Sequence, residues 1–180
     1  DLSRAVSGWQ RYSGDIYVAS FLKDPVQVFV DGERYSMARY PNEGFALIQE
    51  DSASNNNFLS DLPFSAQQLV GAQAQVRARH WVYEGRNITS VSGKRIYLSG
   101  SSRYRLQKDY GYILTGKLWL LDEPGEWFYD KNSKQLFVQL RQGYQPNTHQ
   151  VLGSYYDYGV KLDDVAHIIV EDITIRYARD

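Results

Sequence analysis

Cysteine is absent from the 180 residues of the chain, and methionine occurs once. Without cysteine the chain has no disulfide bond, thiol nucleophile or cysteine-based zinc site. The sequence holds no run of 18 or more apolar residues, so we expect no helix that spans a membrane. The formal net charge of −1 provides no overall field for nucleic acid or a membrane surface, and we expect neither as a partner.

Aromatic residues are what the chain has in excess: fifteen Tyr, seven Phe and four Trp. Tyr and Trp favour the half-buried, pleated surface of a β-sheet. Their rings also stack on the apolar C–H faces of sugars. An all-β core accounts for most of them, and the remainder are candidates for contacts with a glycan.

Short alternating segments separated by turn residues run along most of the chain. Asp31-Gly32 is suited to a type I′ hairpin turn between strands at 26–30 and 34–39. Residues 73–83 alternate with period two and predict one strand. Ser65 and Gln68 have the spacing of a capping box, which predicts a short helix or turn. The pattern indicates an all-β protein.

The densest turn chemistry lies between residues 111 and 140. We expect a strand over 110–121, a type II turn at Pro124-Gly125, and two further strands over 126–129 and 135–140. The polar residues 130–133 would close the hairpin between the last two.

The C-terminal residues 160–180 differ in kind. Short β-branched segments alternate around the two-residue corners Asp163-Asp164 and Glu171-Asp172, as in one coil of a parallel β-helix. One coil cannot bury its apolar face alone, so we expect stacked coils beyond Asp180 and interpret the chain as a fragment of a longer protein. An antiparallel edge strand is the alternative that these residues leave open.

Four segments, in this order, resemble the right-handed parallel β-helix family of polysaccharide-degrading enzymes, which includes glycoside hydrolases and is similar to polysaccharide lyases. They are ARYPNEG at 38–44, LVGAQAQVRARHW at 69–81, LDEPGEWFYD at 121–130 followed by QLFVQL, and HIIVEDITIRYA at 167–178. The resemblance implies an antiparallel β-sandwich or barrel-like module with an attached right-handed parallel β-helix coil. Residues 1–11 would be a linker or the end of a preceding coil, 12–159 the inserted module, and 160–180 the start of the coils.

The resemblance also implies a secreted, periplasmic or cell-surface bacterial enzyme. Its partners would be a polysaccharide or oligosaccharide and the remainder of the parent β-helix. The catalytic residues of such enzymes project from later coils, so we expect them outside this chain. Calcium stays open for the parent enzyme and has no support in this sequence.

Asp122 and Glu126 are the candidate catalytic carboxylates. Glycoside hydrolysis needs two carboxyl groups facing each other across a bond, about 5–9.5 Å apart, whereas residues of one turn usually point apart. A role in the turn is therefore the preferred interpretation. We expect Arg39 to form an ion pair with Glu126, because a partly buried guanidinium needs a carboxylate partner.

The candidate glycan-binding residues are Trp127, beside a turn, and the tyrosine cluster Tyr155, Tyr156 and Tyr158. Trp119 lies in an expected central strand and is assigned to the core.

We expect no metal site. The three histidines lack metal-ligand spacing, and the Asn-rich loop 51–61 lacks the spacing and glycine of an EF-hand. His80 next to Arg77 and Arg79 suggests a contact with an acidic sugar, but strict alternation would place it on the opposite face from the two arginines.

The leading hypothesis is an accessory module that shapes the substrate groove of a secreted β-helical carbohydrate-active enzyme. A stand-alone carbohydrate-binding module and a non-catalytic structural or adhesin segment are the alternatives. The aromatic content does not separate the three, because core packing explains it equally well.

Overall fold

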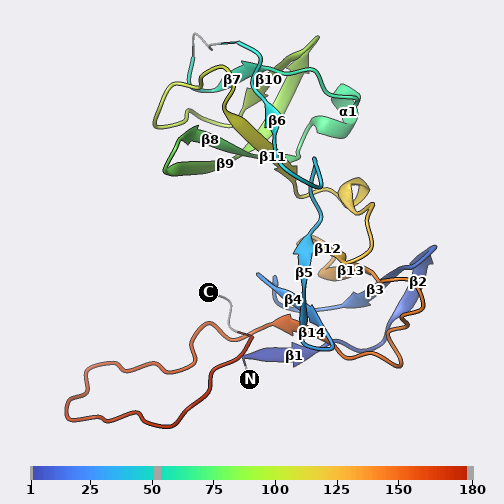
Figure 1. Ribbon diagram of the computed structural model, residues 1–180, viewed down its shortest axis with the longest axis vertical. Coiled ribbons are helices and arrows are strands. Elements are labelled where there is room, and N and C mark those ends of the chain that lie inside the picture. Colours follow the sequence, from blue (N-terminus) through green and yellow to red (C-terminus); the bar gives the residue numbers. More distant parts are fainter. Residues whose placement is uncertain (1, 51–53, 178–180) are drawn as a thin grey trace. The chain divides into compact units, whose positions relative to one another are not determined.

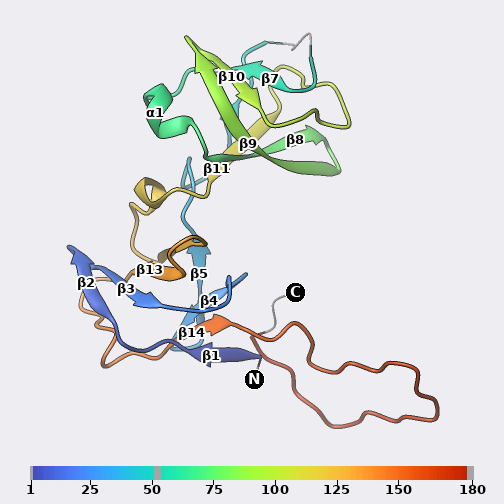
Figure 2. The same ribbon diagram turned by 180° about the vertical axis from the view of Figure 1, so that it is seen from behind.

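The computed structural model describes residues 2–50 and 54–177. The chain folds into two compact units (Figures 1 and 2). Unit 1 comprises Asp1–Met37 and Leu121–Asp180, and unit 2 is Ala38–Leu120. Each unit is built on one curled β-sheet, so the expected all-β class is confirmed. The expected inserted module, residues 12–159, spans the whole of unit 2 and much of unit 1.

Unit 2 contains a six-stranded antiparallel sheet. The strands lie in the order β6 (Ala46–Leu47), β11 (Gly111–Thr115), β8 (Gln73–Arg79), β9 (Val82–Ser92), β10 (Arg95–Leu98) and β7 (Asn57–Leu59). One face of β8 is buried at Ala74, Val76 and Ala78, while the residues between them are half-buried. This alternation divides the sheet into an inner face that forms the core and an outer face.

A short helix, α1 (Ala66–Leu69), precedes β8 in unit 2. The Ser65 hydroxyl accepts from the backbone N–H of Gln68, and the Gln68 side chain accepts from the backbone N–H of Ser65. This capping box satisfies two amides that the first helical turn leaves without partners, as the sequence predicted.

Unit 1 contains an eight-stranded sheet. Its order is β1 (Ser3–Ala5), β14 (Val151–Ser154), β4 (Val28–Val30), β5 (Glu33–Met37), β12 (Glu126–Asp130), β13 (Gln135–Gln139), β3 (Ile16–Ser20) and β2 (Gln10–Ser13). β5 and β12 are parallel, and the other pairs are antiparallel. Residues 3–5 and 10–11, in the range expected as a linker or preceding coil, belong to this sheet.

The predicted turns of unit 1 are confirmed. Asp31 and Gly32 have φ values of +50° and +84°, both positive as a type I′ turn requires. Gly125 has φ +93°, which suits the third position of a type II turn after Pro124. Asp130 accepts from the backbone of Asn132 and the hydroxyl of Ser133, and thereby closes the β12–β13 hairpin.

Two predicted strands are wrong in extent. Residues 73–83 form β8, a two-residue turn at His80-Trp81 and the start of β9. The strand expected over 110–121 ends at Thr115, because Gly116 has φ +80° and a 3-10 turn follows at Leu118–Leu120. Trp119 lies in this turn, half-buried, with its ring 4.5 Å from that of Phe64, rather than in a central strand.

The β-helix coil expected at the C-terminus is not present in the described residues. From 155 to 177 no strand is formed, and the segment leaves the sheet of unit 1 as a long loop (Figure 1). It returns to β1, where the carbonyl of Arg176 accepts a hydrogen bond from the backbone N–H of Leu2. A β-helix coil is held by pairing with neighbouring coils, and residues 155–177 pair with no strand in the described part of the chain. Among the described residues, no helix is long and apolar enough to cross a membrane.

Candidate functional site

Glu126 begins β12 and faces the backbone of its own turn. Its side chain is buried, and Oε2 accepts from the backbone N–H groups of Asp122 and Glu123, both at 3.4 Å. Burial raises the pKa of Glu126 to about 7, and the two backbone hydrogen bonds oppose this rise. Asp122 is exposed at the same turn. These contacts support a turn-stabilising role for Glu126 and do not set the two carboxyl groups across a substrate bond.

Arg39 makes its contacts within unit 2. Its Nε donates to the carbonyl of Pro41 at 2.8 Å, and its Nη2 donates to the carbonyl of Gly44. Glu126 belongs to unit 1. The expected Arg39–Glu126 ion pair therefore stays a prediction, and each side chain has partners of its own.

Trp127 lies in the core of unit 1. Its side chain is 2% exposed in the core of unit 1, and its Nε1 donates to the carbonyl of Tyr35 at 3.1 Å. Its ring packs in a core cluster that includes Val28 and Leu136, which are distant from it in the sequence or on another strand. The sequence-based expectation that Trp127 would be exposed is wrong.

The tyrosine cluster lies after β14 in unit 1. Tyr156 and Tyr158 are exposed, whereas Tyr155 is half-buried with the Arg4 guanidinium 4.4 Å from its ring centroid. The Tyr155 ring also packs edge-on against Phe21. Tyr155 therefore anchors the start of the loop, and a glycan contact by Tyr156 and Tyr158 stays a prediction.

Three neighbouring strands of unit 2 form a surface that the sequence did not predict. Cross-strand pairs and the alternation of side chains place one residue set on the outer side of β9, β8 and β11. We call this set, together with Phe45, the outer face; Phe45 belongs to it because its ring lies against Gly111. The other members are Tyr83, Gly85 and Asn87 from β9, Arg77, Gln75 and Gln73 from β8, and Gly111, Ile113 and Thr115 from β11. Figure 1 shows the three strands side by side.

Two aromatic rings of the outer face are exposed to solvent. Phe45 and Tyr83 are 44% and 52% exposed. Their centroids are 6.3 Å apart and their planes are inclined by 28°, so the two rings are roughly parallel. Gly111 makes this arrangement possible, since a Cβ atom there would lie 2.5 Å from the Cβ of Phe45.

Two arginines flank the rings. The Arg77 guanidinium carbon is 5.9 Å from the Tyr83 centroid, and that of Arg39 is 6.0 Å from the Phe45 centroid. Arg77 Nη2 also lies 3.3 Å from His80 Nδ1 and donates to the His80 carbonyl at 3.3 Å. The expectation that His80 would lie away from Arg77 is wrong, because the turn at His80-Trp81 interrupts the alternation.

Amide groups occupy the middle of the outer face. Gln75 Nε2 donates to Gln73 Oε1 at 3.0 Å, and within residues 2–50 and 54–177 no hydrogen bond is made by Gln75 Oε1 or Gln73 Nε2. Both amides lie close to Gly85, where a Cβ atom would be 3.1 Å from Gln73 Nε2. The glycine thus keeps this part of the face flat.

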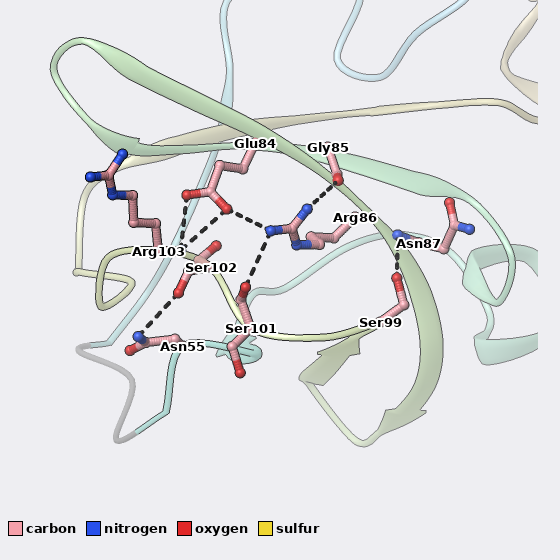
Figure 3. Close-up of polar contacts among 9 residues, drawn as sticks. All are labelled: Asn55, Glu84, Gly85, Arg86, Asn87, Ser99, Ser101, Ser102 and Arg103. Carbon is pink, nitrogen blue, oxygen red and sulfur yellow. Dashed lines mark hydrogen bonds and ion pairs between the residues drawn. The ribbon is translucent and has the colours of Figure 1, made fainter.

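On the other side of β9, a polar network fixes the loop 99–103 (Figure 3). Glu84 accepts from the backbone N–H of Arg103 at 3.0 Å and pairs with Arg86 Nη2 at 2.9 Å. Arg86 also donates to the Ser101 carbonyl, and Asn55 donates to that of Ser102. The Glu84 carboxylate is fully engaged in holding backbone and cation, so its role is structural.

A cavity of about 360 Å³ lies near β6 in unit 2, beside Tyr40, Ile48 and Ser60. Two of its lining residues are Asp61 and Asp109, but Asp61 already pairs with Lys94 at 2.5 Å. The Ser60 hydroxyl donates to the Leu47 carbonyl and accepts from the Tyr112 hydroxyl. The polar groups of this cavity are thus largely used within the protein.

The outer face contains no pair of carboxyl groups. Its ten residues include rings, amides and a guanidinium but no carboxylate, so it lacks a general acid or base pair. Among residues 2–50 and 54–177, no group of three or more His, Asp or Glu side chains could hold a metal ion. In the loop considered for calcium, Asp51 lies outside the described residues and Asn57–Leu59 form β7.

No protein-family model matches the sequence, and a search of curated proteins finds no match. Among solved structures, the fold is similar to a chain titled "Glycoside hydrolase", with a TM-score of 0.66 and 19% sequence identity. The similarity covers 84% of this chain and 31% of that one, so this chain spans about a third of the length of its structural neighbour. At this identity the likeness shows a shared fold.

Proposed function

We propose that the chain is an accessory module of a carbohydrate-active enzyme, and that it binds a polysaccharide on the outer face of unit 2. The observation that carries the proposal is the exposed, roughly parallel pair of Phe45 and Tyr83. Exposed aromatic rings offer apolar faces on which a sugar can stack. The similarity in fold to a protein titled as a glycoside hydrolase supports the same class of ligand.

The chemistry around the rings fits a sugar. A pyranose has an apolar C–H face and a rim of hydroxyl groups, so it needs both stacking and hydrogen-bond partners. The Gln73 and Gln75 amides provide a free donor and a free acceptor on the same face. Trp81, at the β8–β9 turn and 73% exposed, offers a further ring at the end of the surface.

In this proposal the bond-breaking residues lie on another part of a secreted or cell-surface enzyme. The apolar loop of unit 1 would pack on that part, which we take to be a parallel β-helix. The support is a series of exposed apolar side chains, since a soluble surface rarely leaves so many uncovered. They are Val160, Leu162, Val165, Ile168, Ile169, Val170, Ile173 and Ile175.

The binding proposal is tested on a glycan array followed by calorimetry with the best ligand. Tyr83→Ala should weaken binding about tenfold, which corresponds to roughly 1.4 kcal/mol of lost stacking. Tyr158→Ala, which removes a comparably exposed ring from unit 1, is the matched control and should bind like the native chain. Thermal unfolding of both variants checks that the fold is intact.

Two outcomes would contradict the proposal. If the native chain retains no glycan, the module does not bind carbohydrate. If Tyr158→Ala abolishes binding while Tyr83→Ala does not, the glycan lies on the tyrosine loop of unit 1 and the outer face is not the site.

A further inference from the structure

We infer that the glycan bound by the outer face is acidic, and that the guanidinium groups of Arg77 and Arg39 recognise the carboxylates of its uronic acid units. This inference rests on the proposed function and specifies the class of ligand. It is carried by the distribution of charge and by the way in which the two arginines are held.

Charge is distributed unevenly along the chain. The segment Ala38–Leu120, which is unit 2, holds ten lysine and arginine residues and six aspartate and glutamate residues, a net charge of +4. The rest of the sequence carries ten basic and fifteen acidic residues, a net charge of −5. The overall charge of −1 conceals this asymmetry. A cationic unit attracts an anionic ligand before any contact is made.

Half of the acidic residues of unit 2 are already used in ion pairs away from the outer face. These pairs are Glu84–Arg86, Asp61–Lys94 and Glu50–Arg95. In contrast, Arg39 and Arg77 have no carboxylate partner among the described residues. The two arginines beside the exposed rings therefore contribute to the net positive charge of unit 2, because no ion pair neutralises them.

Arg77 is held in a fixed position. Its Nη2 donates to the His80 carbonyl, and its guanidinium lies beside the Tyr83 ring. Its Nε is enclosed and has no hydrogen-bond partner among the described residues. A partly desolvated guanidinium that lacks a counter-ion gains more from a carboxylate than a fully hydrated one does.

Arg39 is oriented in a similar way. Two backbone carbonyls, of Pro41 and Gly44, accept from its Nε and Nη2. These contacts fix the planar guanidinium beside the Phe45 ring without neutralising its charge. Because little side-chain entropy is left to lose, binding of an anion at this position is favoured.

The cationic surface continues beyond the outer face. Arg79 and Arg103 place their guanidinium carbons 4.9 and 5.7 Å from the centroid of Tyr104. Arg79 Nη1 also donates to the Arg105 carbonyl at 3.0 Å. A chain of acidic sugars would thus meet further positive charge after it passes Arg77.

Nucleic acid is the competing anionic polymer, since bases also stack on aromatic rings. A glycan is favoured because the fold is shared with a protein titled as a glycoside hydrolase. In addition, the Gln73 and Gln75 amides lie next to the rings and match the hydroxyl groups of a pyranose. The experiment below separates the two.

Calorimetry with the full 180-residue chain tests the inference. The probes are hexamers of galacturonate and of mannuronate, together with the methyl ester of the galacturonate hexamer, which keeps the rings and removes the charge. The acid form of at least one hexamer should bind ten or more times more tightly than the ester. Arg77→Gln and Arg39→Gln should each reduce this preference about threefold or more, whereas Lys117→Gln, in the same unit, should leave it unchanged.

The outcomes separate the inference from the proposed function. If neutral glycans, including the ester, bind as well as the acid forms, the ligand is not acidic and the module still binds carbohydrate. Tighter binding of a single-stranded DNA oligomer would overturn uronate as the ligand. If no glycan binds, the proposed function fails together with the inference. Unchanged thermal unfolding of Arg39→Gln and Arg77→Gln shows that a lost preference does not reflect unfolding.

Discussion

The ring of Phe45 lies directly on Gly111, in the space that a side chain would otherwise fill. An added Cβ atom at position 111 would be 2.5 Å from Cβ and 2.7 Å from Cγ of Phe45. The glycine of β11 thus allows a residue that precedes β6 to become part of the outer face. The aromatic pair with Tyr83 depends on this contact.

Replacement of this glycine should therefore displace Phe45. We expect Gly111→Ala to lower the free energy of unfolding by about 1–3 kcal/mol, the usual cost of overpacking, and to weaken glycan binding. Chemical denaturation and calorimetry measure the two effects. Gly85→Ala is the matched control for stability, because its added Cβ meets only the flexible ends of Gln73 and Gln75. Equal stability of the two variants would show that Phe45 is not held by Gly111.

The buried carboxyl group of Glu126 should make the protein less stable as the pH rises. A carboxylate in an ion pair has the opposite effect, because its pKa is lowered in the folded state. The pKa of Glu126 is raised from 4.5 to about 7 by burial, so the folded state binds the proton more tightly than the unfolded state. Stability should fall as the pH rises from about 4.5 to 7 and then level off, a loss of up to about 3 kcal/mol.

Substitution of Glu126 by glutamine separates this effect from that of other groups. The side-chain amide oxygen of the Glu126→Gln variant would keep the hydrogen bonds from residues 122 and 123 without a charge. Urea unfolding of this variant at pH 5 and pH 8 should therefore show a smaller pH dependence than the native chain and a higher stability at pH 8. Glu123→Gln, exposed in the same turn, serves as the control. If the native chain is more stable at pH 8 than at pH 5, and Glu126→Gln removes this difference, the raised pKa of Glu126 is refuted.

Local signals in the sequence predicted the parts of the fold that local chemistry decides. Asp31-Gly32, Pro124-Gly125 and the Ser65–Gln68 capping box each rely on residues within four positions of one another. The turn at His80-Trp81 lacks glycine, proline and asparagine, and the alternating pattern continues through it. A hairpin was therefore predicted as a single strand.

The outer face could not be predicted in the same way, because it is assembled from distant residues. Phe45, Tyr83 and Gly111 meet only through strand pairing in the sheet of unit 2. The overall charge of −1 likewise gave no sign of a cationic unit, since opposite charges elsewhere in the chain compensate for it. The prediction that Trp127 is exposed is wrong for a related reason, because its burial follows from packing in a core that distant residues assemble.

Trp127 is expected to act on stability and not on binding. Trp127→Phe keeps most of the apolar volume but removes the donor to the Tyr35 carbonyl, so the free energy of unfolding should fall by about 1–3 kcal/mol. The affinity for any glycan that the native chain binds should stay unchanged. Thermal unfolding and calorimetry on the same sample provide the comparison. Loss of binding in a fully folded Trp127→Phe variant would return this residue to the list of sugar contacts.

The network in Figure 3 yields a local test of how the loop 99–103 is held. Glu84→Ala removes both the acceptor for the Arg103 amide and the partner of Arg86, so it should free the loop and cost about 1–3 kcal/mol. The Arg103 amide should exchange its hydrogen markedly faster, as NMR-detected exchange would show, whereas amides of β8 should change little. Glu84→Gln keeps one acceptor oxygen and should give intermediate exchange. If the Arg103 amide exchanges equally fast in the native chain and in Glu84→Ala, the loop is held by other contacts, such as that between Asn55 and Ser102.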